Sequence, residues 1–172
     1  KGGGDRDVPL CCGIADPGEM GTGPYEFVSH GHELYNMGNM YEGAAAYYQA
    51  TGKRNWLEVA EKSARHVNRV FFEGDPRYND GRPVNQAPGC EVIEMALCKL
   101  YRATGKTLYL EMAKRFLAVR GVTIVPKSRG LASPIYAQQH QPFVQHVTAV
   151  GHPERGPPLV SGTLHRAAVD LG

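Results

Sequence analysis

The chain has 172 residues, of which 42% are hydrophobic, so it is long enough to form one domain with a core of its own. Its 19 basic and 17 acidic residues leave a formal net charge of +2, which gives no electrostatic footprint for nucleic acid or for an anionic membrane surface. No apolar run is long enough to span a membrane, and the first residues show no signal-peptide pattern. The four cysteines lack C-x-x-C spacing and a dense disulfide pattern, which indicates reduced thiols and favours a cytoplasmic location.

The chain is predicted to change character at residue 30. Residues 1–29 are rich in glycine, proline and aspartate and show no periodicity, so we expect a loop or a poorly ordered segment there. Helical periodicity begins after this segment, and we assign residues 30–172 to one helical domain.

The segment over residues 30–53 has the pattern of a helix that lies inside a protein. Most other positions are small or apolar, so we expect water to touch little of this helix. Its one polar row begins at His32, which predicts that the N-terminal end of the helix faces a cavity. The apolar side chains recur at steps of three and four and share one helical face, which comprises Leu34, Met37, Tyr41, Ala45 and Tyr48.

Local signals bound this helix and predict the next one. Gly52 follows the last periodic residue, and glycine readily adopts the left-handed conformation that ends a helix. Asn55 and Glu58 have the spacing of a capping box, and a simple amphipathic pattern follows over about residues 55–72. This pattern predicts an outer helix with one solvent-exposed face, followed by a loop over residues 74–88.

The same scheme recurs at an offset of 53 residues. Ala50-Thr-Gly-Lys53 returns as Ala103-Thr-Gly-Lys106, and Trp56 matches Tyr109. The repeat predicts a second inner helix over residues 89–104 and a second outer helix over residues 107–120. Inner and outer helices that alternate through short turns are typical of an α/α toroid, and two hairpins are too few to close such a ring. We therefore expect an all-α fold that is part of a larger barrel. Further along, a short strand over 122–125, a third inner helix over 143–155 and a terminal helix over 164–172 are weaker expectations.

Two groups of residues at the starts of the inner helices are candidates for chemistry. His32 begins the first of them, and the alternative is a histidine that only caps or packs at the helix end. Glu91 and Glu94 share a face of the second inner helix at i and i+3, and Cys90 shares a face with Glu94 at i and i+4. Carboxylates on an apolar helix need partners or a solvated pocket, unless they are an exposed pair that the helix dipole favours.

Two more candidates follow the second hairpin. His140 lies near Gln138, and His152 follows a glycine; each histidine taken alone is compatible with a structural role. Zinc binding by the histidines is not supported, because their separations match no compact metal motif. Cys11 and Cys12 have no neighbouring base and no helix start that would lower their pKa, so they stay unassigned, and no residue is identified as catalytic.

Five ordered segments resemble glycoside hydrolase family 127, the β-L-arabinofuranosidases and their relatives. The match runs from about Gly31 to His152. The segments are His32-Glu-Leu-Tyr-Asn-Met-Gly-Asn-Met-Tyr-Glu42, Tyr47-Tyr-Gln-Ala-Thr-Gly52, Glu91-Val-Ile-Glu-Met-Ala-Leu-Cys-Lys-Leu-Tyr-Arg-Ala-Thr-Gly105, Tyr136-Ala-Gln-Gln-His140 and Ala149-Val-Gly-His152.

The resemblance implies a catalytic domain built as an (α/α)6 barrel that removes terminal arabinofuranose from glycans with retention of configuration. It also implies a zinc-held cysteine thiolate as nucleophile and a glutamate as acid/base, a variant of the two-carboxylate scheme. None of these catalytic or zinc residues has a match here, so we expect no metal ligand in this chain and no hydrolysis by it alone. The residues expected to bind substrate are His32, His152, Gln138, His140 and Cys90.

Departures from the family pattern leave other functions open. Cys90 and Asn39 stand where family members usually carry histidine, and Pro153-Glu-Arg155 replaces a helical Ala-Val-Arg. We expect the N-terminal part of a barrel whose partners are arabinose-containing glycans and the missing C-terminal part of the same protein. The alternatives are a non-catalytic helical-repeat module and another α/α-toroid sugar enzyme, such as an epimerase or an unsaturated glucuronyl hydrolase.

Overall fold

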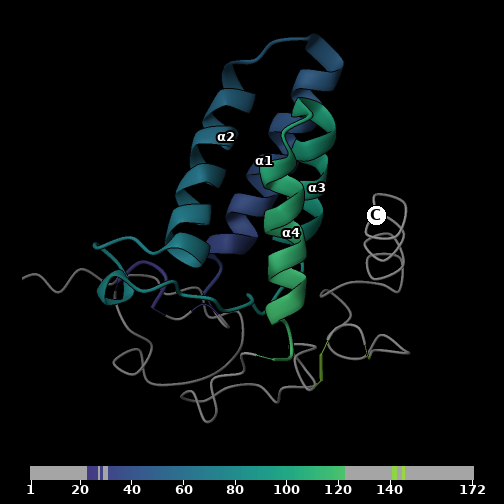
Figure 1. Ribbon diagram of the computed structural model, residues 1–172. Helices are drawn as coiled ribbons and strands as arrows, with labels where there is room; N and C mark the ends of the chain where they lie inside the picture. Colours follow the sequence, from purple (N-terminus) through teal and green to yellow (C-terminus); the bar gives the residue numbers. More distant parts are fainter. Residues whose placement is uncertain (1–22, 27, 29–30, 123–140, 143–144, 146–172) are drawn as a thin grey trace, which may run out of the picture.

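The structure, a computed structural model, describes residues 23–26, 28, 31–122, 141–142 and 145 (Figure 1). Most of the predicted N-terminal loop, nearly all of the short strand and of the third inner helix, and the whole terminal helix lie outside these residues. The same holds for three of the predicted binding residues, which are Gln138, His140 and His152. In the part of the chain that is described, no helix is long and apolar enough to cross a membrane.

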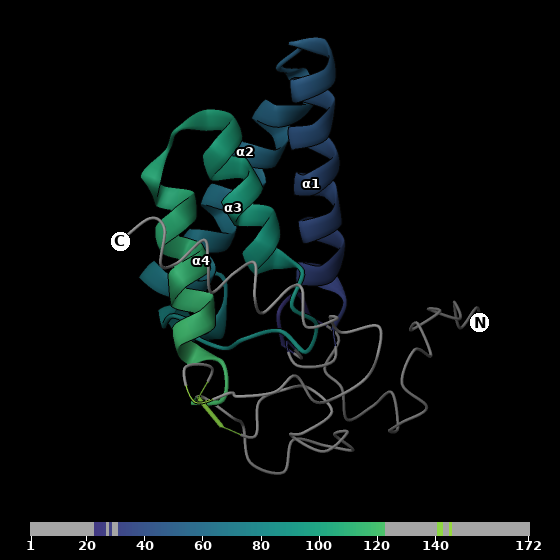
Figure 2. The ribbon, with the colours of Figure 1, turned by 90° about the vertical axis from the view of Figure 1, so that its right-hand side faces the viewer.

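Four α-helices form two hairpins that stand side by side (Figures 1 and 2). The first hairpin comprises α1 (Glu33–Thr51) and α2 (Asn55–Asn68), and the second comprises α3 (Ile93–Thr104) and α4 (Thr107–Val119). The inner helices α1 and α3 pack against each other, and each also packs against its own outer helix. All four helices predicted from periodicity and from the 53-residue repeat are therefore confirmed within the described residues.

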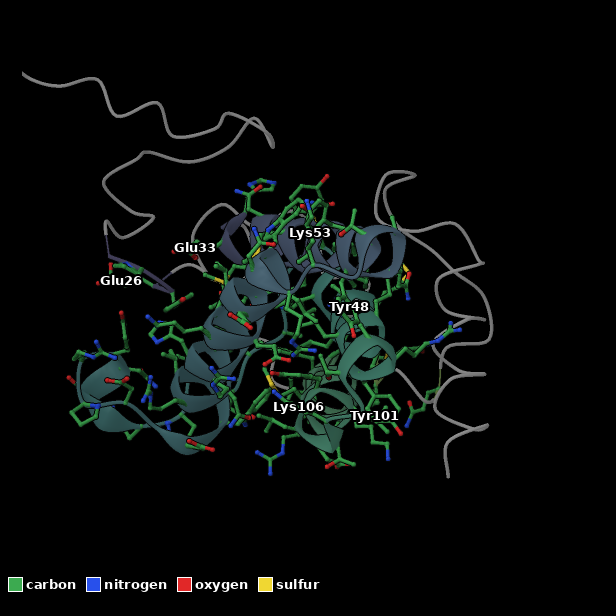
Figure 3. All side chains as sticks on the ribbon, turned by 90° about the horizontal axis from the view of Figure 1, so that it is seen from above. Glu26, Glu33, Tyr48, Lys53, Tyr101 and Lys106 are labelled. Atoms are coloured by element: carbon green, nitrogen blue, oxygen red, sulfur yellow. The ribbon has the colours of Figure 1, made fainter. Side chains whose placement is uncertain are left out.

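The two hairpins turn at the same end of the bundle through the same local structure. Gly52 and Gly105 both have φ +70°, and their N–H groups donate to the carbonyls of Tyr48 and Tyr101 at 2.8 and 2.7 Å. Such left-handed glycines satisfy carbonyls that a helix leaves unpaired at its C-terminus. The hydroxyls of Thr51 and Thr104 each accept a hydrogen bond from the lysine N–H two residues later. Figure 3 views this end of the bundle.

The predicted capping box at the start of α2 is wrong. Asn55 is the first helical residue, Arg54 occupies the N-cap with helical backbone angles, and no described side chain caps the helix. The Glu58 N–H, which an Asn55 cap would satisfy, already donates to the Arg54 carbonyl at 2.9 Å, because the helix starts one residue earlier than predicted.

Outer helix α2 continues into a short π-helix over Arg69–Glu73, named η2. The following loop contains a 3₁₀ turn, η3 (Asn79–Gly81), and then folds back onto the end of the helix. Val84 and Asn85 donate backbone hydrogen bonds to the carbonyls of Val70 and Phe71 at 3.1 and 3.0 Å. These bonds satisfy carbonyls that the helix end leaves open, and they direct the chain toward the start of α3.

The core lies between the inner and outer helices. It includes side chains from all four, with Tyr41, Leu57, Leu97 and Phe116 fully buried. The expectation that water touches little of α1 is wrong, because Tyr35, Asn39, Ala46 and other side chains of α1 are exposed. No described residue covers that side of the helix.

Candidate functional site

Both inner helices begin at the end of the bundle opposite the Thr-Gly-Lys turns (Figure 1). His32 precedes α1, Cys90 and Glu91 precede α3, and Arg120 follows α4. The chain comes back to this end at Gln141, whose backbone lies against Gly121. This end therefore gathers residues from four separate segments of the sequence, and we call it the site end.

His32 occupies the N-cap of α1 without using its side chain as a cap. Its ring is partly exposed and meets the ring of Tyr35 edge-on, with centroids 5.8 Å apart and planes at 88°. Of the simpler alternative, a histidine that caps or packs at the helix end, the capping part is wrong and the packing part agrees with the contact to Tyr35. The position leaves the imidazole accessible at the site end, where its nitrogens can donate or accept a hydrogen bond.

A close approach between the inner helices fixes the start of α3 beside α1. Gly38 of α1 is buried, and a Cβ placed there would lie 2.8 Å from Val92 Cγ1 and 3.1 Å from the Ile93 backbone nitrogen. A glycine is required at such a contact because no side chain fits between the two backbones. The contact holds Cys90 and Glu91, just upstream of Val92, at the site end near the first turns of α1.

A buried ionic cluster joins the start of α3 to the end of α4. The Arg120 guanidinium donates to Glu94 Oε1 at 2.6 Å and to Glu91 Oε1 at 3.3 Å. The side chains of Glu94 and Arg120 are 0% and 1% exposed. The two carboxyl groups thus share Arg120 as a partner, and the alternative of an exposed acidic pair at a helix start is wrong.

The surroundings of Arg120 keep it charged. Burial alone would lower the pKa of its guanidinium, but the opposing charges of Glu94 and Glu91 outweigh burial and raise that pKa. The second carboxyl oxygen of Glu94, Oε2, is buried and accepts no hydrogen bond from a described residue. The cluster therefore connects the start of α3 to the end of α4 and leaves the Glu94 Oε2 acceptor without a described donor.

The structure changes the local picture around Cys90. Helix α3 begins at Ile93, so Cys90 and Glu91 lie before the helix and share no helical face with Glu94. Cys90 is partly buried. Cys98 lies within α3, where burial and then the charge of Glu94 raise the pKa of its thiol. Raised pKa values disfavour the reactive thiolate, so Cys98 is a structural cysteine.

Sequence reasoning missed Arg120. The signal that could have found it was the unexplained pair Glu91 and Glu94, which required a buried cation from another element. Arg120 is the first residue after α4. The sequence could not single it out among several arginines, because the contact joins residues 26 and 29 positions apart.

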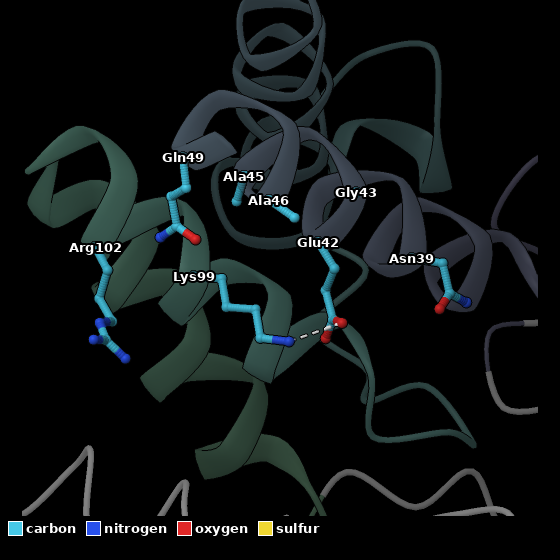
Figure 4. Close-up of a pocket in the computed structure, with 8 residues that line it drawn as sticks. All are labelled: Asn39, Glu42, Gly43, Ala45, Ala46, Gln49, Lys99 and Arg102. Atoms are coloured by element: carbon cyan, nitrogen blue, oxygen red, sulfur yellow. Dashed lines mark ion pairs between the residues drawn. The ribbon is translucent and has the colours of Figure 1, made fainter. Parts of the chain in front are cut away.

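A groove of about 510 Å³, lined by both polar and small apolar side chains, runs along α1 and α3 toward the turn end (Figure 4). Lys99 of α3 and Glu42 of α1 form an ion pair across it at 2.8 Å. Asn39, Gln49 and Arg102 also line it, and their side chains are exposed. Among the residues that the structure describes, no cluster of three or more His, Cys, Asp or Glu side chains could hold a metal ion.

Comparison with known proteins identifies the family. The sequence model of the β-L-arabinofuranosidase catalytic domain of glycoside hydrolase family 127 matches residues 19–169. This chain belongs to glycoside hydrolase family 127. It is 32% identical over 157 residues to the non-reducing end β-L-arabinofuranosidase of Bifidobacterium longum subsp. longum, covering 82% of this chain and 23% of that protein.

Solved structures of family members share the fold. A family 127 β-arabinofuranosidase superimposes with a TM-score of 0.65 at 40% identity, over 81% of this chain and 20% of that one. The family 127 β-L-arabinofuranosidase of Geobacillus stearothermophilus T6 gives a TM-score of 0.68 at 31% identity, over 82% and 23% of the two chains. The fold is that of a partial (α/α)6 barrel, as predicted. The chain spans about a fifth to a quarter of the length of these relatives.

Proposed function

We propose that this chain supplies part of the sugar-binding rim of a family 127 glycoside hydrolase that acts on terminal β-L-arabinofuranose. The relatives described above are β-arabinofuranosidases by name, which favours this substrate over those of epimerases and unsaturated glucuronyl hydrolases. The substrate is a glycan, and the bound unit is its terminal sugar.

The observation that carries this proposal is the meeting of separate segments at the site end. His32 lies at the start of α1, Cys90 just before α3, and Gln141 against Gly121. Sugar hydroxyls require several hydrogen-bonding groups that converge from different elements and are held firmly. The close approach at Gly38 and the Arg120 cluster provide that rigidity.

The roles follow from the chemistry of each group. The His32 imidazole would donate or accept a hydrogen bond with a sugar hydroxyl, and Cys90 would contribute a compact, weakly polar contact where relatives usually place an imidazole. His140 directly precedes Gln141, and this supports His140 and its neighbour Gln138 as rim residues. His152 remains a proposal that rests on the sequence resemblance.

The chain on its own would bind sugar without cleaving it. The zinc-held thiolate and the acid/base glutamate that the family resemblance implies match no residue of this sequence. Hydrolysis by a retaining enzyme needs both groups on opposite sides of the glycosidic bond. The proposal therefore separates binding, which this chain would contribute, from bond cleavage, which other residues would supply.

The test is calorimetric titration of the full 172-residue chain with L-arabinose, beside a thermal melt of each variant. We expect saturable binding that His32→Ala weakens about tenfold without lowering the melting temperature, since the ring is partly exposed and caps nothing. Lys62→Ala, on the exposed side of α2, is the matched control and should bind like the parent. Equal affinities for the parent and His32→Ala, or a loss of stability alone, would exclude His32 from the rim.

A further inference from the structure

A second pocket lies at the site end, on the side of the outer helix α2. Its volume of about 330 Å³ is close to the lower limit for small-molecule sites, so it can hold one small ligand. Two segments far apart in the sequence form it: residues 24–26, which precede α1, and residues 78–86, in the loop that contains η3 (Figure 1). We call it the loop pocket, and its lining includes Tyr25, Glu26, Tyr78, Asn79, Val84 and Gln86.

The Tyr25 wall of the loop pocket is held in an unusual conformation. Tyr25 has φ +65°, in the left-handed region that bulky residues rarely adopt. Its N–H donates to Glu33 Oε1 at 2.9 Å, and its ring meets the rings of Phe71 and Tyr78 edge-on, with centroids 5.4 Å away in each case. Strained residues persist where the surrounding structure holds them, and they cluster at binding sites. The hydrogen bond to Glu33 also ties the pocket to the first turn of α1, directly after His32.

The opposite wall of the loop pocket is fixed by side-chain hydrogen bonds within the loop. The Arg77 guanidinium donates to both carboxylate oxygens of Asp75, at 3.0 and 2.7 Å. The Asn79 Nδ2 donates to the carbonyls of Arg82 and Pro83 at 3.1 and 3.2 Å. A pocket whose walls are held in place before the ligand arrives loses little conformational entropy on binding.

The polar groups of the loop pocket keep hydrogen-bonding capacity for a ligand. Because Asn79 Nδ2 is already engaged, Oδ1 is left to accept, and no described residue donates to it. The partly exposed Gln86 side chain has no hydrogen-bond partner among the described residues, so its amide can both donate and accept. Glu26 is positioned by the Gly23 N–H, which donates to its Oε2 at 3.1 Å. Two amides and a carboxylate beside aromatic and aliphatic surface match a sugar, which offers hydroxyl groups and apolar ring carbons.

The charges around the loop pocket favour a neutral ligand. Among the described residues that line it, Glu26 carries the only charged side chain, and a carboxylate repels an anion. The Arg77 guanidinium lies over the Tyr78 ring, 5.6 Å from its centroid, so a second cation at this ring would be repelled. Burial, followed by the charge of Glu33, raises the pKa of Tyr25 to about 12, which keeps its hydroxyl neutral at physiological pH. The pocket therefore suits an uncharged ligand rich in hydroxyl groups.

We propose that the loop pocket is a second carbohydrate-binding subsite, which takes a neutral sugar unit of the glycan beyond its terminal L-arabinofuranose. This inference rests on the proposed function, because the rim holds the terminal unit and the same glycan then reaches the pocket. The Tyr25–Glu33 hydrogen bond places the pocket beside the start of α1, where the rim begins. Two linked contacts reinforce each other, so a longer glycan binds more tightly than a single sugar, although the pocket alone binds weakly.

The first experiment is calorimetric titration of the full 172-residue chain with L-arabinose and with a trisaccharide of L-arabinofuranose. We expect the trisaccharide to bind about tenfold more tightly. Gln86→Leu keeps the size of the side chain but removes its hydrogen-bonding groups, so it should abolish this advantage and leave the affinity for L-arabinose unchanged. Gln49→Leu, at an exposed glutamine of α1 outside the pocket, is the matched control and should keep the advantage.

Amide chemical shifts of the ¹⁵N-labelled parent chain test the pocket directly, also where Gln86→Leu fails to fold. The trisaccharide should shift the amides of Tyr78, Asn79 and Gln86, which L-arabinose leaves in place at concentrations that saturate the rim. If the rim assignment alone is wrong, the trisaccharide shifts these three amides but not that of His32. Equal affinities of the parent for the two ligands, pocket amides that stay in place with the trisaccharide, or a response to tetramethylammonium instead would overturn the proposal.

Discussion

The two ends of the helical bundle are built in different ways. At the turn end, both hairpins use the same Thr-Gly-Lys structure, held by hydrogen bonds between residues no more than four positions apart. At the site end, the contacts join distant residues and none is repeated: Gly38 with Val92, Arg120 with Glu91 and Glu94, and Gly121 with Gln141. The repeated turns fix how each hairpin folds back on itself. The contacts at the site end occur once each, so differences in ligand specificity can arise there.

The largest expected effect comes from the centre of the site end. Arg120→Met would leave two carboxyl groups buried against an apolar side chain, which costs about 3–5 kcal/mol when one partner of a buried ion pair is removed. Denaturant unfolding followed by circular dichroism measures this cost. Arg102→Met, at an exposed arginine of α3 that forms no ion pair with a described residue, is the control and should change stability by less than about 0.5 kcal/mol. Similar losses of unfolding free energy in both variants would show that the buried cluster does not stabilise the fold more than an exposed arginine does.

The close approach at Gly38 gives the next effect. An alanine there gains roughly 1 kcal/mol in helix propensity but overpacks a contact made partly by backbone atoms of α3, which costs about 1–3 kcal/mol and should dominate. Thermal unfolding of Gly38→Ala, alone and combined with Val92→Ala, separates the gain in helix propensity from the cost of overpacking. The double variant should recover part of the loss, because truncation removes the nearest atom, Val92 Cγ1. A stabilised Gly38→Ala would contradict the close approach.

The turn end should respond to equivalent changes by equal amounts. Thr51→Val and Thr104→Val each remove a hydroxyl that donates to a helix carbonyl and accepts the lysine N–H, at a cost of about 0.5–1.5 kcal/mol. Because the two turns are separate, the double variant should show the sum of the single losses within about 0.5 kcal/mol. Chemical unfolding of the three variants provides the comparison. Strong non-additivity would mean that the turns are coupled and that the repeat is not modular.

The smallest effect is a pH dependence near the loop that follows α2. Burial, followed by the charges of Arg77 and Arg69, lowers the pKa of His66 from its ordinary value. The unfolded chain then binds the proton more readily than the folded one, so His66 reduces stability as the pH falls below about 6.5 and has no effect above it. His66→Gln should flatten this part of the melting-temperature profile. Identical profiles for the parent and the variant would show that the imidazole titrates normally.

The sequence predicted the elements that depend on local pattern. Periodicity placed α1 and α2, and the repeated Thr-Gly-Lys segment placed α3 and α4, because a helix and its C-terminal glycine are encoded within a few residues. It did not predict that one side of α1 is exposed, because exposure depends on which neighbours are present and not on the helix itself. The capping box at Asn55 failed because α2 starts one residue earlier, so that the Glu58 N–H donates to the Arg54 carbonyl and needs no side-chain cap.

The candidate site was predicted only in part, because some of its contacts depend on how the helices pack and not on local sequence pattern. His32 and Cys90 were proposed from their position at helix starts and from family resemblance, and both lie at the site end. Arg120 was not found, since its role is set by two carboxyl groups that come close only when α3 and α4 pack. Contacts between residues far apart in sequence carry no local signal. A single sequence without a strong motif therefore does not predict which residues make them.

The most direct test of the account is to map L-arabinose onto the folded chain by amide chemical shifts of a ¹⁵N-labelled sample. The account predicts shifts confined to the site end, at Gly31–Asn36, Gly89–Ile93 and Gly121–Val122. The amides of the two Thr-Gly-Lys turns, which have the same helical surroundings, should stay in place. Shifts that cluster at the turns, or that spread evenly over both ends, would contradict the placement of the sugar site where the inner helices begin.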